Sequence, residues 1–437
     1  MEERYSYRIT KRIAQFHFHH RWYLRFGTIH FLPRSSLSEL STHRKRELTR
    51  SPSPSMADWS RLPNELLQLI SEKLNFSEIY IIRFRSVCSS WRSSIPNYPH
   101  NHSPLKLPIF PYSKEIYRPS QTILYKHNIF LIKPPITPHH HQQQTHTSCL
   151  IRIGPNLNGK TQLWHPLSIH QPPFNFPYHV LDFNQLPVFD LGEELYIHDT
   201  DLLQNNRYIH LEKVVVVATC QGRQSLAFRT DNCSAGVPFG VPMVLGCGAD
   251  GWTRIPTMST SLLGDMCIFK GRPCVADNNG HTVMIGPDSS VHLLANAVFG
   301  GYIKFLVKSE HELLLVDCNG IDAGDDDVSI DVFRLDEKEK KWVKLTNLGD
   351  RVLFLGEDCS FSASASELCV ANGNCVIYSR DYASHGLYSM ESGMLDSMES
   401  GMRIFHLDQG RVSPLSGYPD YFKLFWSPSD WIVGLQK

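Results

Sequence analysis

The chain has 437 residues, of which 42% are hydrophobic, 11% aromatic and 20% charged. Its length suits one small and one large domain, because single cores stop growing at roughly 250–300 residues, and its composition excludes a mostly disordered chain. The net charge of zero hides an asymmetry: residues 1–55 hold eleven Lys/Arg against four Asp/Glu, which leaves 32 against 39 elsewhere. A body of net charge −7 has no general attraction for phosphate backbones, so we do not expect nucleic acid as a partner.

The cysteines and the apolar runs narrow the class further. The eleven cysteines include no C-x-x-C pair, which indicates free thiols in a reducing compartment rather than disulfides or a zinc site. The longest apolar runs, such as Val214–Ala218, fall far short of the roughly 18 residues of a membrane span. We therefore expect a protein of the cytoplasm or nucleus with no membrane segment, no cofactor and no metal.

Residues 1–55 have no helical or alternating period and close on a Ser-Pro-Ser-Pro-Ser linker. Three interpretations of this basic, unstructured extension stay open. Its arginines fit an organellar transit peptide, the less favoured address, which Glu2 and Glu3 weaken. Arg44–Arg46 fits a nuclear address or a solvated charge cluster. Met56 fits an alternative start, which would make the extension a gene-model artefact.

Residues 56–100 are predicted to form a small helical domain. Four apolar residues spaced four apart predict one stripe of a helix from about Pro63 to Leu74. Ser77 can begin a second helix, whose apolar residues keep a roughly helical spacing as far as the prolines beyond Ile95. Such short helices cannot bury this much Leu, Ile and Trp among themselves, so the module needs another surface. Periodicity alone leaves open whether that surface is the larger domain or another protein.

The residue types favour another protein. Trp59-Ser-Arg-Leu62-Pro63-Asn-Glu-Leu66-Leu67, followed by Arg83-Phe-Arg-Ser-Val87-Cys88-Ser-Ser-Trp91-Arg92, resembles the F-box, with Leu-Pro at its first helix and Val-Cys-x-x-Trp in its last. This resemblance implies that the module binds the Skp-type adaptor of a Skp–cullin–F-box ubiquitin ligase, and through it a cullin. The adaptor-binding residues that it implies are Leu62, Pro63, Leu66, Leu67, Ile70, Leu74, Val87, Cys88 and Trp91.

Residues 105–437 are predicted to form one large β domain. Short apolar stretches such as Lys304–Val307 alternate with Gly, Asn, Asp and Pro, which indicates a sandwich, barrel or propeller. A Trp-x-x-aliphatic pattern begins at Trp164, Trp252 and Trp342, spaced by 88 and 90 residues, about twice the length of a propeller blade. The number of residues then predicts six or seven blades.

Several stretches resemble the plant F-box proteins that carry a C-terminal KIB-type β-propeller. They are Asp265–Gly271, Glu312–Asp317, Leu355–Ser362 and Tyr418–Trp426. The resemblance implies a mainly β chain in which a small N-terminal α-helical F-box precedes a six- or seven-bladed propeller. We expect the last segment, Phe422–Trp426, to be a strand that closes the propeller ring.

Three stretches depart from this resemblance and are expected to be loop insertions. They are the His139–His141 run with its following glutamines, the acidic run Asp322–Asp327, and the tandem Ser-Met-Glu-Ser-Gly-Met copies at 389–394 and 397–402. The histidines fit a polar loop better than a metal site, and the acidic run lacks the ligand spacing of a calcium loop.

One motif suggests an enzyme. Residues Gly154–Thr161 fit the P-loop expression G-x-x-x-x-G-K-[ST], and Leu313–Asp317 resembles a strand whose last carboxylate holds magnesium. A P-loop needs a helix that starts at its Lys-Thr, and Pro166 and Pro172 exclude one, so we interpret the motif as a hairpin turn. We find no catalytic residue and predict that the chain is not an enzyme.

We therefore expect the substrate-recognition subunit of a ubiquitin ligase, whose F-box binds the adaptor and whose propeller binds a target protein. One alternative is a stand-alone propeller that binds and inhibits a partner, such as a kinase, without ligase assembly. A third hypothesis, a P-loop hydrolase, depends on nucleotide binding by Lys160.

Overall fold

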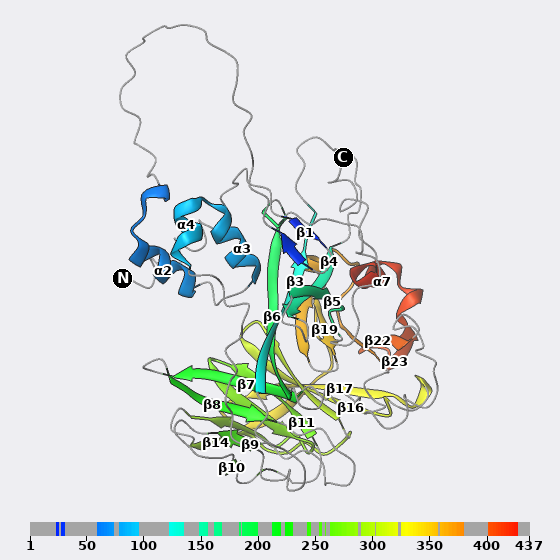
Figure 1. Cartoon of the computed structure of the whole chain (residues 1–437). Coiled ribbons are helices and arrows are strands. Elements are labelled where there is room, and N and C mark those ends of the chain that lie inside the picture. The colour runs from blue at the N-terminus through cyan, green and yellow to red at the C-terminus, as the bar shows by residue number, and fades with distance from the viewer. Residues whose placement is uncertain are drawn as a thin grey trace, which may run out of the picture.

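The computed structural model describes residues 23–25, 28–30, 59–73, 78–95, 122–134, 148–155, 161–167, 183–199, 212–219, 223–229, 243–245, 253–255, 258, 263–321, 325–379 and 401–426, with gaps at 185, 287–289, 302 and 357–358. Leu74, Lys160, Trp252, the His139–His141 run and most of residues 1–55 lie outside them. Strands outnumber helices, and the helices before residue 100 form one group, so the predicted mainly β chain with an N-terminal helical module is confirmed (Figure 1).

The elements follow one another in chain order. The helical segments are η1 (Trp59–Arg61), α2 (Asn64–Lys73), α3 (Glu78–Ser86), α4 (Ser89–Ser94), η3 (Asp325–Asp327), α5 (Ala365–Leu368), η5 (Leu415–Gly417) and α7 (Pro419–Trp426). The strands are β1 (Tyr23–Arg25), β2 (Thr28–His30), β3 (Thr122–Ile132), β4 (Cys149–Pro155), β5 (Thr161–Trp164), β6 (Val188–Asp199), β7 (Glu212–Thr219), β8 (Arg223–Arg229), β9 (Met243–Leu245), β10 (Thr253–Arg254), β11 (Leu263–Phe269), β12 (Arg272–Asp277), β13 (Thr282–Ile285), β14 (Val291–Ala295), β15 (Ile303–Ser309), β16 (Glu312–Asn319), β17 (Ser329–Asp336), β18 (Lys341–Leu345), β19 (Arg351–Leu355), β20 (Ser360–Ser364), β21 (Cys375–Ser379), β22 (Met402–His406) and β23 (Arg411–Pro414). No helix among the described residues is both long and apolar enough to cross a membrane.

The helical module has a core of its own. Leu67 of α2, Phe84 of α3 and Trp91 of α4 are each at most 2% exposed and belong to one apolar cluster. The ring centroids of Phe84 and Trp91 lie 4.7 Å apart. The indole N–H of Trp91 donates a hydrogen bond of 2.9 Å to the carbonyl of Trp59, which joins α4 to η1.

The predicted second helix is wrong in one respect, because it is two helices. The segment α3 ends at Ser86, and Cys88, the residue that caps α4, has extended backbone angles (φ −163°, ψ 178°). A straight helix would hold Phe84 and Trp91 two turns apart, whereas the break folds Trp91 back onto Phe84. The sequence pattern is helical on both sides of Val87–Cys88 and therefore conceals the break.

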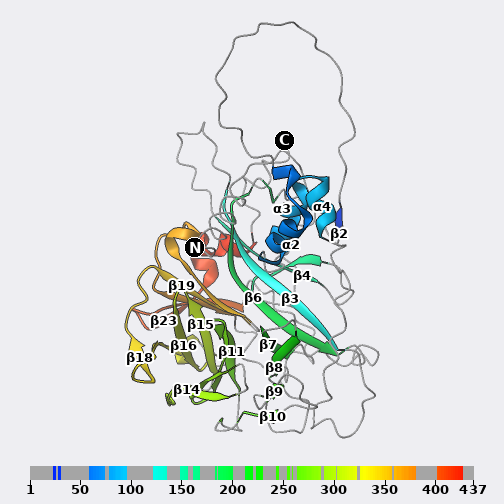
Figure 2. The same cartoon turned by 90° about the vertical axis from the view of Figure 1, so that its left-hand side faces the viewer.

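The described strands form three larger sheets and one small pair. Their orders are β10-β9-β8-β7-β6-β3-β4-β5, β11-β12-β13-β14 and β18-β17-β16-β15-β20-β19-β21-β22-β23. The two long strands β3 and β6 pair antiparallel from Thr122↔Asp199 to Ile132↔Val188, and the helical module lies at one end of them (Figure 2). The small pair is β1–β2, an exception to the expectation that residues 1–55 contain no regular structure.

Two consecutive groups of strands have the order expected of propeller blades. The strands β11–β14 and β15–β18 are four-stranded antiparallel meanders in which each strand pairs with the next. The repeated tryptophans mark the edges of the sheets. Trp164 ends the edge strand β5, and Trp342 lies in the edge strand β18. The remaining tryptophan of the repeat, Trp252, directly precedes β10, which is also an edge strand.

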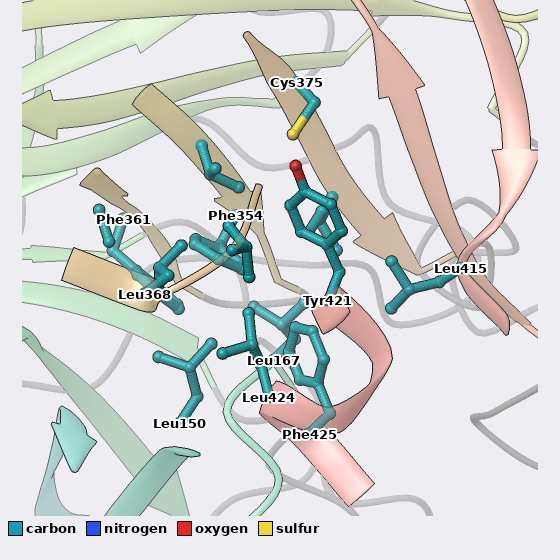
Figure 3. Packing of buried hydrophobic residues seen from close by; sticks show 14 of the residues in the cluster. Leu150, Leu167, Phe354, Phe361, Leu368, Cys375, Leu415, Tyr421, Leu424 and Phe425 are labelled. Carbon is teal, nitrogen blue, oxygen red and sulfur yellow. The ribbon is translucent and has the colours of Figure 1, made fainter. Parts of the chain in front are cut away.

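The C-terminal helix α7 closes the core against the N-terminal strands. Leu424 and Phe425 are at most 2% exposed and pack in one cluster with Leu150 of β4 and Leu167. Figure 3 shows these side chains meeting Phe354, while the hydroxyl group of Tyr421 points toward Cys375. The two ends of the large domain are therefore joined by side-chain packing.

The prediction of a closing strand at Phe422–Trp426 is wrong, since these residues belong to α7. Tyr421, Leu424 and Phe425 are spaced as i, i+3 and i+4, so a helix places all three on the buried side. Pro419 stands at the first helical position, where its missing N–H costs nothing.

The predicted loop insertions need two corrections. Residues 389–400 lie outside the described part, but Met402, the last residue of the second copy, begins β22 and is fully buried. In the acidic run, Asp325 accepts a hydrogen bond of 3.0 Å from Nε of Arg403 and is therefore ion-paired, not merely solvated. Buried residues therefore follow the acidic run, at Val328, and end the second tandem copy, at Met402.

Candidate functional site

The outer face of α2 carries exposed leucines. Leu66 is 46% exposed and Leu69 is 54% exposed, although α2 lies in a module with a well-packed core. Pro63, just before the helix, is also exposed, and Ile70 is half-buried. Positions 63, 66, 69 and 70 follow helical spacing, so these groups form one apolar surface, which we call the α2 surface.

The other predicted site residues divide between this surface and the module's interior. Leu67 is fully buried and Trp91 is 2% exposed, so these two hold the module together from inside. Leu62, Val87 and Cys88 are half-buried and pack against that inner cluster. Leu74 lies outside the described residues.

Sequence reasoning missed Leu69. The four-residue spacing of Leu62, Leu66 and Ile70 defines the stripe, and Leu69 falls beside it rather than on it. A helix surface also brings together residues three apart, so Leu66 and Leu69 are neighbours on the same exposed face. The signal was present as a second apolar residue at i+3.

Two arginines fasten the end of the module. Nη1 of Arg85 lies 3.4 Å from the carbonyl oxygen of Ile95, and Nε of Arg92 donates to the carbonyl of Arg85 at 3.3 Å. Burial, with the neighbouring charge of Arg92, lowers the pKa of Arg85. An arginine stays protonated even so, because its ordinary pKa lies above 12. These hydrogen bonds hold the end of α4 in place within the module that carries the α2 surface.

The P-loop resemblance has no structural counterpart. The strands on either side of it, β4 and β5, are an antiparallel pair in which Pro155 opposes Thr161. A strand, not a helix, therefore begins at Thr161, and there is no helix N-terminus to receive phosphates. Lys160 lies outside the described residues.

The second half of that resemblance also fails. Asp317 lies in β16 with its Oδ1 atom 2.7 Å from Nζ of Lys304, and the two side chains are 5% and 0% exposed. The carboxylate is thus neutralised inside the protein and does not face a ligand. Across the described residues, no three His, Cys, Asp or Glu side chains gather as a metal site would require.

Comparison with known proteins divides the chain in the same way. Residues 59–102 match the family description "F-box domain", and residues 118–406 match "KIB1-4 beta-propeller". The chain is 34% identical to the F-box protein SKIP23 of Arabidopsis thaliana over 425 residues, which is 86% of this chain and 96% of that protein. It is 29% identical to the F-box protein At2g17036 of the same plant, over 86% of this chain and 95% of the relative. The F-box/kelch-repeat protein At2g24250 is 29% identical over 75% of this chain and 84% of its own length.

Proposed function

Because this chain belongs to the F-box proteins that carry a KIB1-4 β-propeller, we propose that it is the substrate-recognition subunit of a Skp–cullin–F-box ubiquitin ligase. In this proposal the helical module binds a Skp-type adaptor, and through it a cullin, while the propeller binds a target protein. Ubiquitin transfer belongs to other subunits. This chain contributes proximity, since it raises the effective concentration of the target near the loaded ubiquitin carrier.

The exposure of Leu66 and Leu69 is the observation that carries the proposal. Two large apolar side chains side by side on one helix are costly to leave in water, and covering the exposed half of each leucine contributes about half of the roughly 1.5–3 kcal/mol that full burial gives. A partner helix or groove that covers both would gain this apolar burial, and the neighbouring contacts of the module would add to it. The proposed contact set is Leu62, Pro63, Leu66, Leu69 and Ile70, with Val87 and Cys88 at its rim and Leu67 and Trp91 as internal supports.

Reconstitution tests the proposal. The full chain is co-expressed with a plant Skp-type adaptor and a cullin, and the assembly is isolated by size exclusion. We expect a stoichiometric complex that is lost when Leu62→Ala is combined with Pro63→Ala, while the variant chain still melts cooperatively. A chain that never associates with the adaptor would contradict the proposal and leave a stand-alone binding propeller.

A further inference from the structure

Helix α3 has two buried faces that serve different parts of the chain. Ile81 and Phe84, three residues apart, belong to the module's own core with Leu67 and Trp91. Ile79, by contrast, is fully buried in a cluster built from the first sheet. One face of α3 therefore belongs to the helical module and another to the large domain.

The second face continues along the helix. Ile79, Arg83 and Ser86 are spaced as i, i+4 and i+7, which places them in one row on the helix surface. All three contact residues 183, 184 and 186, just before β6. Ile79 shares its cluster with Phe183 and Leu186, and Oγ of Ser86 donates to Oδ1 of Asn184 at 3.0 Å. The segment thus meets the helix through side chains.

Arg83 adds contacts to the main chain of the same segment. Its Nε donates to the carbonyl of Phe183 at 2.9 Å, and its Nη2 donates to the carbonyl of Leu186 at 2.7 Å. These two carbonyls lie outside the β-strands, so no sheet ladder occupies them. The planar guanidinium suits this double contact, because its donors are held in a fixed fork, whereas a lysine offers a single ammonium.

We propose that Arg83 is a positioning residue, which locks the F-box onto the propeller in one orientation through the carbonyls of Phe183 and Leu186. The inference rests on the proposed function and deepens it. The α2 surface and the 79/83/86 row lie on different helices, so in this proposal an adaptor on α2 leaves the contacts of α3 with the propeller in place. Proximity accelerates transfer only when the bound target is held at a defined place, so a loosely hinged F-box would forfeit part of the benefit.

Distance measurement on the full chain tests the lock. Dyes are attached through non-canonical amino acids at Gln68 of α2 and Lys338 of the β17–β18 turn, both exposed, and single-molecule energy transfer is recorded with and without the adaptor. We expect one narrow distance distribution in the wild type. Arg83→Ala should broaden it at least twofold, and Arg83→Lys should broaden it less.

Arg85→Ala is the matched control, two residues further along the same helix. Because Arg85 bonds within the module, its loss should leave the distribution narrow. Arg83→Gln, which removes the guanidinium fork but keeps much of the apolar stem, replaces Arg83→Ala if that variant does not fold. An unchanged distribution in Arg83→Ala or its substitute overturns the lock.

Adaptor binding separates the two proposals. Arg83→Ala should bind the Skp-type adaptor within twofold of the wild type, because Arg83 does not lie on the α2 surface. A wild-type chain that fails to bind the adaptor contradicts the proposed function, whereas the distance distribution of the free chain still decides the lock. Loss of adaptor binding in Arg83→Ala alone would instead assign Arg83 to the F-box fold and overturn the positioning role.

Discussion

The indole Nε1–H of Trp342 donates a hydrogen bond of 2.9 Å to the carbonyl oxygen of Gly280, 62 residues earlier in the chain. Trp342 belongs to the meander β15–β18 and Gly280 to the turn between β12 and β13, so the bond joins two consecutive four-stranded units. The Trp342 side chain is 7% exposed and lies in a cluster to which both units contribute. A repeated edge-strand tryptophan thus couples one unit of the large domain to the next.

Trp342→Ala should therefore destabilise the large domain by about 3–5 kcal/mol, since it removes a buried aromatic ring and leaves a cavity. Trp342→Phe keeps most of the ring and removes one of the two donors to the carbonyl of Gly280, which still accepts a hydrogen bond of 2.9 Å from Oγ1 of Thr282, so it should cost only about 0.5–1.5 kcal/mol. Urea unfolding followed by circular dichroism measures both. Equal stability of the alanine variant and the wild type would show that the residue does not support the core.

Breaking the buried Lys304–Asp317 pair should cost more stability than breaking an exposed ion pair with the same N···O distance. Lys304→Met leaves a buried carboxylate without its counter-charge and should cost about 3–5 kcal/mol, while the double change Lys304→Met with Asp317→Leu should recover much of the loss. Lys344 and Asp331 are also 2.7 Å apart but about half exposed, so Lys344→Met should cost less than about 1 kcal/mol. The same unfolding assay compares them, and equal losses from the two lysine changes would refute this account.

The free energy of unfolding should also decrease as the pH is lowered, because His165 takes up a proton more readily in the unfolded chain. Burial, with the neighbouring positive charge of Arg152, lowers the pKa of His165 to about 3, while an unfolded histidine titrates near 6.5. Between these values the unfolded chain binds a proton that the folded chain does not. The contribution of this group is therefore intact above pH 6.5 and is lost at about 1.4 kcal/mol per pH unit as the pH falls toward 3.

His165→Asn isolates that effect. Nδ1 of His165 accepts a hydrogen bond from the backbone N–H of Leu167, and the asparagine oxygen can take its place. From pH 7 to pH 5 the free energy of unfolding of the wild type should fall by about 2 kcal/mol more than that of the variant. Parallel pH profiles would show that His165 does not titrate differently in the folded chain.

The sequence was most informative where structure is local. The first F-box helix and its apolar stripe follow from the spacing of Leu62, Leu66 and Ile70. The Trp-x-x-aliphatic repeat indicates a structural role for Trp342, but its place in an edge strand comes from the structure. The prediction of a strand around Leu424 is wrong, because four of the five residues Phe422–Trp426 are apolar and so short an apolar stretch fits a strand as well as a helix. Only the position of the core decides between them.

Other features depend on contacts that no local pattern contains. Leu66 and Leu67 are neighbours in sequence, yet one is exposed and the other is fully buried, because packing against Trp91 sets the rotation of α2. The partners of Arg83 lie 100 and 103 residues away, in a segment without a motif. Periodicity left open whether the module packs on the large domain or binds another protein, and α3 does pack on the large domain while α2 keeps a free apolar surface.

The most direct test of the central claim is the affinity of the full chain for a purified plant Skp-type adaptor, measured by calorimetry. Leu66→Ala combined with Leu69→Ala should weaken binding by at least tenfold, because the adaptor no longer buries two leucine side chains. The melting temperature should stay nearly unchanged, because both side chains are about half exposed in the free chain. Phe299→Ala, which removes a side chain that is 84% exposed in the large domain, is the matched control and should bind as the wild type does. Wild-type affinity in the double leucine variant would contradict the assignment of the α2 surface to the adaptor.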